Sequence, residues 1–266
     1  GYHDVRMVMQ TVYLYDQIVI TKTKQPGVTA ETNLFYLPVD ENNLACRAAK
    51  MLLEEFKITE GVHISMDKKI PVSAGMAGGS ADAAAVLFGV NKMFRLGLSL
   101  EELEKRGVKL GADVPYCLMR GTVLAEGIGE ELTPLPACPK CFVLLAKPPI
   151  SVSTKMVYEK LDALEIAEHP DIDGILDGLS KKNIHKVAEC MGNVLEQVTI
   201  PVYPVIEQIK NVMKEGGAMN AMMSGSGPTV FGLFEDRQSA RHAAQRIKEQ
   251  KLAKQVYVTS IHQTRR

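Results

Sequence analysis

The chain has 266 residues, and its 31 Lys and Arg side chains balance its 31 Asp and Glu side chains, so its formal net charge is zero. A neutral chain has no general field that attracts nucleic acid or an anionic membrane, so we expect neither as a partner and any anion site must be local. No apolar run approaches the roughly 20 residues of a membrane span, and the first residues lack the pattern of a signal peptide. Five cysteines, an odd number in a long chain, suit a reducing compartment, so we expect a cytoplasmic protein.

In the first part of the chain, the spacing of apolar residues changes from that of strands to that of a helix and back. From Val5 to Ile20 the apolar residues mostly alternate, which predicts half-buried strands. Between Asn42 and Phe56 they recur on one helical face, and an asparagine at the start can cap that helix. Alternation returns at 62–66 and leads to Pro71, so the order is strand, loop, helix.

The loop after Pro71 is the most informative stretch. It comprises Pro71, Val72, Ser73, Ala74, Gly75, Met76, Ala77, Gly78, Gly79, Ser80 and Ala81, and the helix formers 83–87 follow directly. Three glycines and small side chains at a helix start let backbone amides approach a phosphate closely. Neither the Walker loop nor the dinucleotide fingerprint is present. The alternative is a small-residue turn before a buried helix that Ser80 or Asp82 caps, and the loop alone does not decide between the two.

The middle of the chain contains a short helix, a polar segment and a break. Ser99 opens a capping box, and Gly111–Pro115 follows with Asp113 at its centre. Residues 121–126 read as a strand. The glycine- and proline-rich run 127–139 predicts a hinge between two halves of a chain longer than the commonest domain size.

The second half predicts a split β-α-β sandwich and hence an α+β fold. The expected elements are a strand at 142–146, helices near 154–164, 183–198 and 204–216, strands at 219–223 and 229–234, a helix opened by Asp236 and a strand at 256–260.

Three segments together resemble the GHMP superfamily of small-molecule kinases, which includes galactokinase, homoserine kinase and mevalonate kinase. They are the glycine loop, Gly111–Pro115, and residues 223–231 with the sequence Met-Ser-Gly-Ser-Gly-Pro-Thr-Val-Phe. Further stretches are similar to the members that act on a cytidine diphosphate-linked methylerythritol, namely Gly1-Tyr2-His3, residues 7–10 and 14–16, Ala77–Ser80 and Lys147-Pro148.

This resemblance implies a two-domain GHMP-kinase-like fold. We expect an ATP-binding N-terminal domain of mixed α/β type, like domain 2 of ribosomal protein S5, over residues 1–136. A ferredoxin-like, substrate-binding C-terminal domain is expected over 137–266. Family members begin with an additional strand that carries a lysine and an asparagine, whereas this sequence starts inside the Gly-Tyr-His motif. We therefore expect one sheet to lack an edge strand.

The resemblance also implies the activity. The expected reaction is Mg²⁺-dependent phosphoryl transfer from ATP to the 2-hydroxyl of the cytidine-linked methylerythritol, a step in non-mevalonate isoprenoid precursor biosynthesis, by a monomer or a homodimer. Two alternatives stay open: a GHMP kinase for a mevalonate- or homoserine-like alcohol, and a non-catalytic kinase-like sensor of a metabolite.

For the phosphate side of the site, the resemblance implies that residues 71–81 bind the phosphates of ATP and that Ser80 reaches Mg²⁺ or a phosphate oxygen. Asp113 matches the aspartate that orients or deprotonates the acceptor hydroxyl. The alternative is that Asp113 only caps a turn before Pro115.

For the acceptor side, the resemblance implies that Ser224, Gly225, Ser226 and Gly227 shape the phosphoryl-transfer site, although a plain hairpin loop is the alternative. The residues expected at the cytosine are Tyr2, His3, Thr154 and Tyr158, with an aromatic ring stacked on the base. Tyr158 is alternatively a core residue beside Val157 and Leu161.

Overall fold

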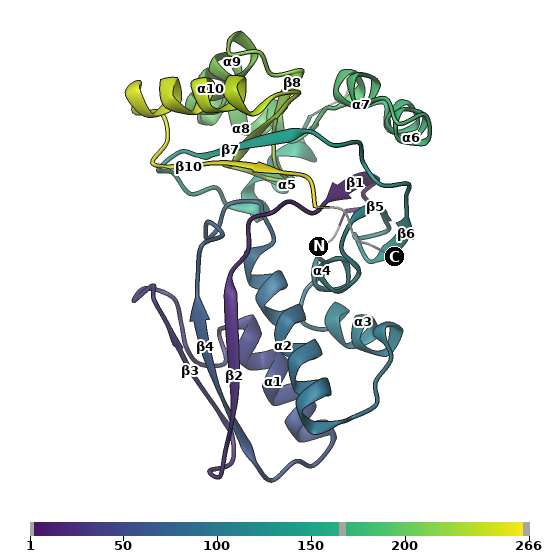
Figure 1. Ribbon diagram of the computed structural model, residues 1–266, viewed down its shortest axis with the longest axis vertical. Helices are drawn as coiled ribbons and strands as arrows, with labels where there is room; N and C mark the ends of the chain where they lie inside the picture. Colours follow the sequence, from purple (N-terminus) through teal and green to yellow (C-terminus); the bar gives the residue numbers. More distant parts are fainter. Residues whose placement is uncertain (1–2, 165–168, 263–266) are drawn as a thin grey trace.

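Three β-sheets organise the computed structural model, which describes residues 3–164 and 169–262 (Figure 1). The first sheet has the order β2-β4-β3, from β2 (Gln17–Thr23), β4 (Gly61–Asp67) and β3 (Val28–Thr32). Strand β4 runs antiparallel to β2 and parallel to β3. Helices α1 (Leu44–Glu55) and α2 (Gly78–Phe94) pack beside this sheet, and the side chains of Leu52, Ile64 and Leu87 between them are fully buried.

The second sheet has the order β1-β5-β6, from β1 (Met7–Gln10), β5 (Thr122–Glu126) and β6 (Glu131–Pro134). Helices α3 (Leu100–Val108) and α4 (Val114–Met119) come directly before β5, and α3 starts with the predicted capping box. The prediction of a hinge over 127–139 is wrong for its first part, because Gly127 and Gly129 take positive φ and turn the chain so that β6 pairs with β5. The expected lack of an edge strand stays a prediction.

The third sheet confirms the split β-α-β sandwich predicted for the second half. Its antiparallel strands have the order β10-β7-β9-β8, from β7 (Phe142–Lys147), β8 (Asn220–Met223), β9 (Val230–Phe234) and β10 (Gln255–Ser260). Helices α9 (Val205–Glu215) and α10 (Arg237–Glu249) pack against it and bury Ile206, Met213 and Phe234.

The helices of the second half differ from the prediction in two places. The predicted helix 183–198 is two helices, α7 (Ile184–Cys190) and α8 (Glu196–Val202), because Met191 adopts an extended backbone and ends α7. The helix near 154–164 is α5 (Thr154–Leu161), and α6 (Ile172–Ser180) has no counterpart among the predicted elements.

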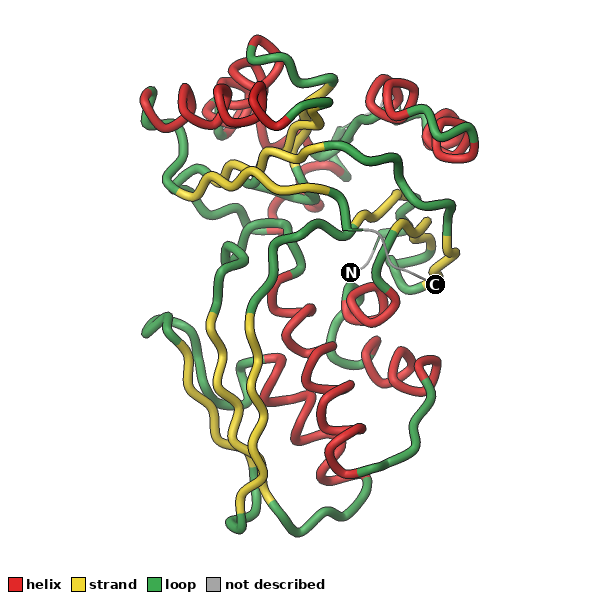
Figure 2. Tube along the Cα trace, in the orientation of Figure 1, coloured by secondary structure: helices red, strands yellow, loops and turns green. Residues whose placement is uncertain are grey.

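The beginning and the end of the described chain pair with one another at the junction of the two halves. Val12 forms an isolated antiparallel bridge with Ile261, and the Tyr13 amide donates to the Ser260 carbonyl at 3.0 Å. Figure 2 shows loops gathered at this junction, between the long helices of the lower half and the upper sheet. Within the described residues, no helix combines the length and the apolar character that crossing a membrane requires.

Candidate active site

The glycine loop joins β4 to α2, and α2 begins at Gly78, before the helix formers 83–87 that the sequence analysis placed after the loop. No side chain of the described chain caps this helix, and its first turn has no acidic residue. Helices α1, α3, α5, α6, α7 and α10 each have a side chain that accepts from a first-turn amide. The amides at the start of α2 therefore lack a side-chain acceptor and carry the positive end of a helix dipole, which is an arrangement that binds anions.

The loop before α2 is tightly coiled and approaches a second loop. Ser73, Gly75 and Ala77 all have positive φ, between +49° and +68°. A Cβ atom on Gly75 would lie 2.2 Å from the Ser224 carbonyl oxygen, so only glycine fits at this position. The hydroxyl of Ser224 donates to the Gly75 carbonyl at 2.7 Å. The structure thus brings the glycine loop and residues 224–227 into direct contact.

The start of α5 joins the same cluster. Thr154 Oγ1 and Ser226 Oγ lie 2.8 Å apart at hydrogen-bonding distance. Thr154 and Tyr158 are four residues apart on α5, so their side chains share one face of the helix.

Asp113 lies at the start of α4, next to the glycine loop. A Cβ on its neighbour Gly111 would lie 4.0 Å from Ser80 Oγ. Within the described chain the Asp113 side chain makes no cap bond to α4, so the turn-cap alternative does not account for its carboxylate. Burial raises the pKa of Asp113. Burial and, to a smaller degree, the Asp113 charge raise the pKa of Tyr158.

Two of the residues expected at the cytosine are stacked on each other. The ring centroids of His3 and Tyr158 are 4.5 Å apart with an interplanar angle of 24°, and His3 Nε2 lies 2.7 Å from Asp162 Oδ1. Val157 and Leu161 are buried in the core, whereas Tyr158 is half-buried and packs against that core with one side. Tyr2 lies outside the described residues.

A buried ion cluster beneath the glycine loop was not predicted from the sequence. The Lys68 ammonium contacts the carboxylates of Asp16 and Asp82, and all three side chains are at most 6% exposed. Asp82 is therefore bonded to Lys68 and is not the cap of α2. One signal was present, because Lys68 continues the alternation of Val62, Ile64 and Met66 and so points into the core.

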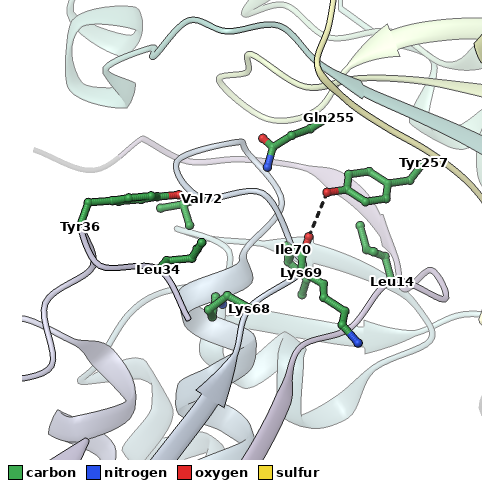
Figure 3. Close-up of a pocket in the computed structure, with 9 residues that line it drawn as sticks. All are labelled: Leu14, Leu34, Tyr36, Lys68, Lys69, Ile70, Val72, Gln255 and Tyr257. Atoms are coloured by element: carbon green, nitrogen blue, oxygen red, sulfur yellow. Dashed lines mark hydrogen bonds between the residues drawn. The ribbon is translucent and has the colours of Figure 1, made fainter. Parts of the chain in front are cut away.

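A cavity of about 380 Å³ adjoins the glycine loop (Figure 3). Ile70 and Val72 line it, and Tyr257 of β10 reaches the same segment, with its hydroxyl donating to the Lys69 carbonyl at 3.3 Å. The remaining lining residues are Leu14, Leu34, Tyr36, Lys68, Lys69 and Gln255. Residues 3–164 and 169–262 contain no cluster of three or more His, Cys, Asp or Glu side chains that would hold a metal ion by themselves.

Comparison with known proteins defines the class. The profile of the GHMP kinases N terminal domain matches residues 43–121, and that of the GHMP kinases C terminal domain matches residues 175–252. The fold and these matches define an ATP-dependent small-molecule kinase of the GHMP type, which confirms the fold class and the enzyme class expected from the sequence.

Relatives narrow the class further. The 4-diphosphocytidyl-2-C-methyl-D-erythritol kinase of Lachnospira eligens is 57% identical over 97% of this chain and 90% of its own length. The kinase of the same name from Clostridium perfringens is 46% identical over 97% of this chain and 90% of its own length. A crystal structure of 4-(cytidine 5'-diphospho)-2C-methyl-D-erythritol kinase aligns with a TM-score of 0.83 at 29% identity, covering 99% of this chain and 92% of that one. The chain belongs to the GHMP kinases and, within them, to the 4-diphosphocytidyl-2-C-methyl-D-erythritol kinase family.

A more distant structure shares the fold only. Homoserine kinase from Cytophaga hutchinsonii aligns with a TM-score of 0.77 at 20% identity, over 97% of this chain and 90% of that one.

Proposed function

We propose that the protein transfers the γ-phosphoryl group of ATP to the 2-hydroxyl of 4-diphosphocytidyl-2-C-methyl-D-erythritol, in the cytoplasmic non-mevalonate route to isoprenoid precursors. The names of its close relatives support this acceptor. The main structural support for phosphoryl transfer is the contact of Ser224 with Gly75. This contact brings the uncapped start of α2, on the donor side, next to Thr154 and Tyr158 on the acceptor side.

The donor side of the site is the glycine loop, residues 71–81. Its amides at the start of α2 bind the phosphates, and the adjoining cavity takes the adenosine part of ATP. Mg²⁺, when bound, neutralises part of the phosphate charge, and Ser80 supplies the protein oxygen for it. A magnesium ion held mainly by phosphates and water needs no cluster of carboxylates, so the residues present fit this ion.

Asp113 acts on the acceptor. The hydroxyl oxygen forms a bond to the γ-phosphorus as the bond to the bridging oxygen breaks, ADP leaves, and the hydroxyl proton passes to Asp113. An ordinary carboxylate is a weak base toward an alcohol, so it accepts the proton as the new bond forms rather than before it. The raised pKa of Asp113 supports this role, because burial makes the carboxylate a stronger base.

The cytosine binds at His3 and Tyr158, with Tyr2 as a further aromatic partner. A ring stacked on a base contributes about 1–3 kcal/mol in nucleic-acid complexes. The centroid distance of 4.5 Å leaves no room for a base between His3 and Tyr158, so the base stacks on the pair from outside or separates the rings. Two domains, 1–136 and 137–266, and a monomeric or homodimeric state complete the proposal.

A coupled ADP-release assay with Mg²⁺ and ATP tests the proposal. We expect turnover with the cytidine-linked alcohol and none with mevalonate or homoserine at equal concentration. Turnover with only one of the latter two refutes the acceptor assignment. ATP binding without turnover of any of the three alcohols supports the sensor alternative instead.

A further inference from the structure

We propose that Asn193 is a positioning residue for phosphoryl transfer. Its side-chain amide binds the backbone on both sides of Ser224, and Ser224 in turn contacts the glycine loop. Asn193 Nδ2 donates to the carbonyl of Met223, the last residue of β8, at 2.9 Å and to that of Gly225 in the loop at 2.8 Å. Its Oδ1 accepts from the Leu195 amide at 3.0 Å just before α8. Both hydrogens of the amide are therefore used across one turn of the loop.

A second group holds the same side of the loop. Glu196 Oε1 accepts from the Met223 amide at 2.6 Å, and Lys210 Nζ lies 2.6 Å from the other carboxylate oxygen of Glu196. The side chains of Glu196 and Lys210 are 16% and 10% exposed. The base of the loop is thus anchored to helices α8 and α9, which belong to the core of the second half.

The loop needs such an anchor because its own backbone has little preference for one conformation. Gly225 and Gly227 have φ of +54° and +89°, which glycine adopts readily but also leaves readily. The two bonds of Asn193 span the residues on either side of Ser224, so they fix the direction in which the Ser224 hydroxyl reaches Gly75. Among the described hydrogen bonds, Asn193 has none to Gly75 or Asp113, so it acts through the loop.

This inference rests on the proposed function, and an isosteric change tests it. Asn193→Asp retains the oxygen that accepts from Leu195 and replaces the two donors by an acceptor that repels both loop carbonyls. Asn220→Asp is a matched control in the same half of the chain. Asn220 Nδ2 donates to the carbonyls of Ala188 at 2.7 Å and Met191 at 3.5 Å, and its Oδ1 accepts from Ala221, but it has no bond to the 224–227 loop among the described contacts.

We expect Asn193→Asp to lower kcat about 10- to 100-fold, because small displacements of a positioning group have effects of this size. The KM for the cytidine-linked alcohol should stay within about twofold, since the loss falls on the transition state. Asn220→Asp should keep kcat within about twofold, although both variants lose stability to a similar degree. An equal fall of kcat in the two variants, or none in Asn193→Asp, overturns the inference.

Hydrogen exchange separates this inference from the proposed function. The amides of residues 224–227 should exchange faster in Asn193→Asp and at the wild-type rate in Asn220→Asp, whether or not the acceptor has been assigned correctly. Unchanged exchange in Asn193→Asp overturns the positioning role. If that variant does not fold, Asn193→Ala removes the donors without the repulsion, and the same differences, smaller in size, are expected.

Discussion

Replacing Lys68 by methionine tests the ion cluster beneath the glycine loop. Lys68, Asp16 and Asp82 have side chains that are 4%, 3% and 6% exposed, so the change leaves two buried carboxylates without their counter-ion. Asp16 also accepts from the Ile70 amide at 2.8 Å and so fixes the entry to the loop. Removal of one partner of a buried ion pair typically costs about 3–5 kcal/mol, and we expect the free energy of unfolding of Lys68→Met to fall by that amount at pH 8.

The loss should depend on pH in a defined direction. Burial raises the pKa of Asp82 from 3.8 to about 7, with Lys68 opposing and Asp16 adding to the rise. Between these two values the folded state binds more protons than the unfolded state, so this group lowers the stability as the pH increases through that window. Without Lys68 nothing opposes the rise in the pKa of Asp82. The loss of unfolding free energy in Lys68→Met should therefore be larger at pH 8, where this carboxylate ionises, than at pH 5.5. Asp82→Asn should remove this part of the pH dependence.

Urea unfolding followed by circular dichroism at both pH values measures these free energies. Lys50→Met is the control, because Lys50 is 52% exposed and its pair with Glu41 is a surface contact. It should change the stability by no more than about 0.5 kcal/mol. A loss below about 1 kcal/mol in Lys68→Met, or equal losses at the two pH values, would refute the reasoning.

The other predictions concern the reacting groups. Asp113→Asn should lower kcat by about 10²- to 10⁴-fold while isothermal titration still shows ATP binding, and the rise of wild-type kcat with pH, through the raised pKa of Asp113, should vanish. Tyr158→Ala should raise the KM for the acceptor by about 5- to 150-fold and Tyr158→Phe by little, and equal effects of both would assign the role to the hydroxyl. Gly75→Ala should lower the ATP affinity and the melting temperature together, since its Cβ would meet the Ser224 carbonyl; wild-type values for both would show that the two loops separate in solution.

Much of the fold could be predicted from the sequence, because the hydrophobic periodicity and the capping residues indicated the same elements. The capping asparagine of α1, the capping box of α3 and the alternation of β4 all lie where the pattern placed them. The predicted elements were wrong where a local backbone conformation interrupted the hydrophobic periodicity. Met191 breaks an otherwise continuous helical pattern, and two glycines with positive φ turn the chain so that the first part of the expected hinge joins a sheet.

The site was readable in part. Residues 71–81 and Asp113 were singled out because their patterns occur together with residues 223–231 in the resemblance to the GHMP kinases, whereas each pattern alone also fits a turn or a cap. Asn193 and Asp16 do not stand out, since their roles depend on groups more than 25 residues away that only the folded chain brings near. Long-range polar partners of this kind leave no periodic signal.

The pairing of Val12 and Tyr13 with Ser260 and Ile261 constrains how the enzyme moves. These contacts join the start of the described chain to its end, so the two halves are held together here as well as by the connection from β6 to β7, the Ser224–Gly75 bond and the Tyr257–Lys69 bond. A protease that cuts between β6 and β7 would leave both fragments associated. We therefore expect rearrangement around a bound substrate in side chains such as His3 rather than as a swing of one half against the other.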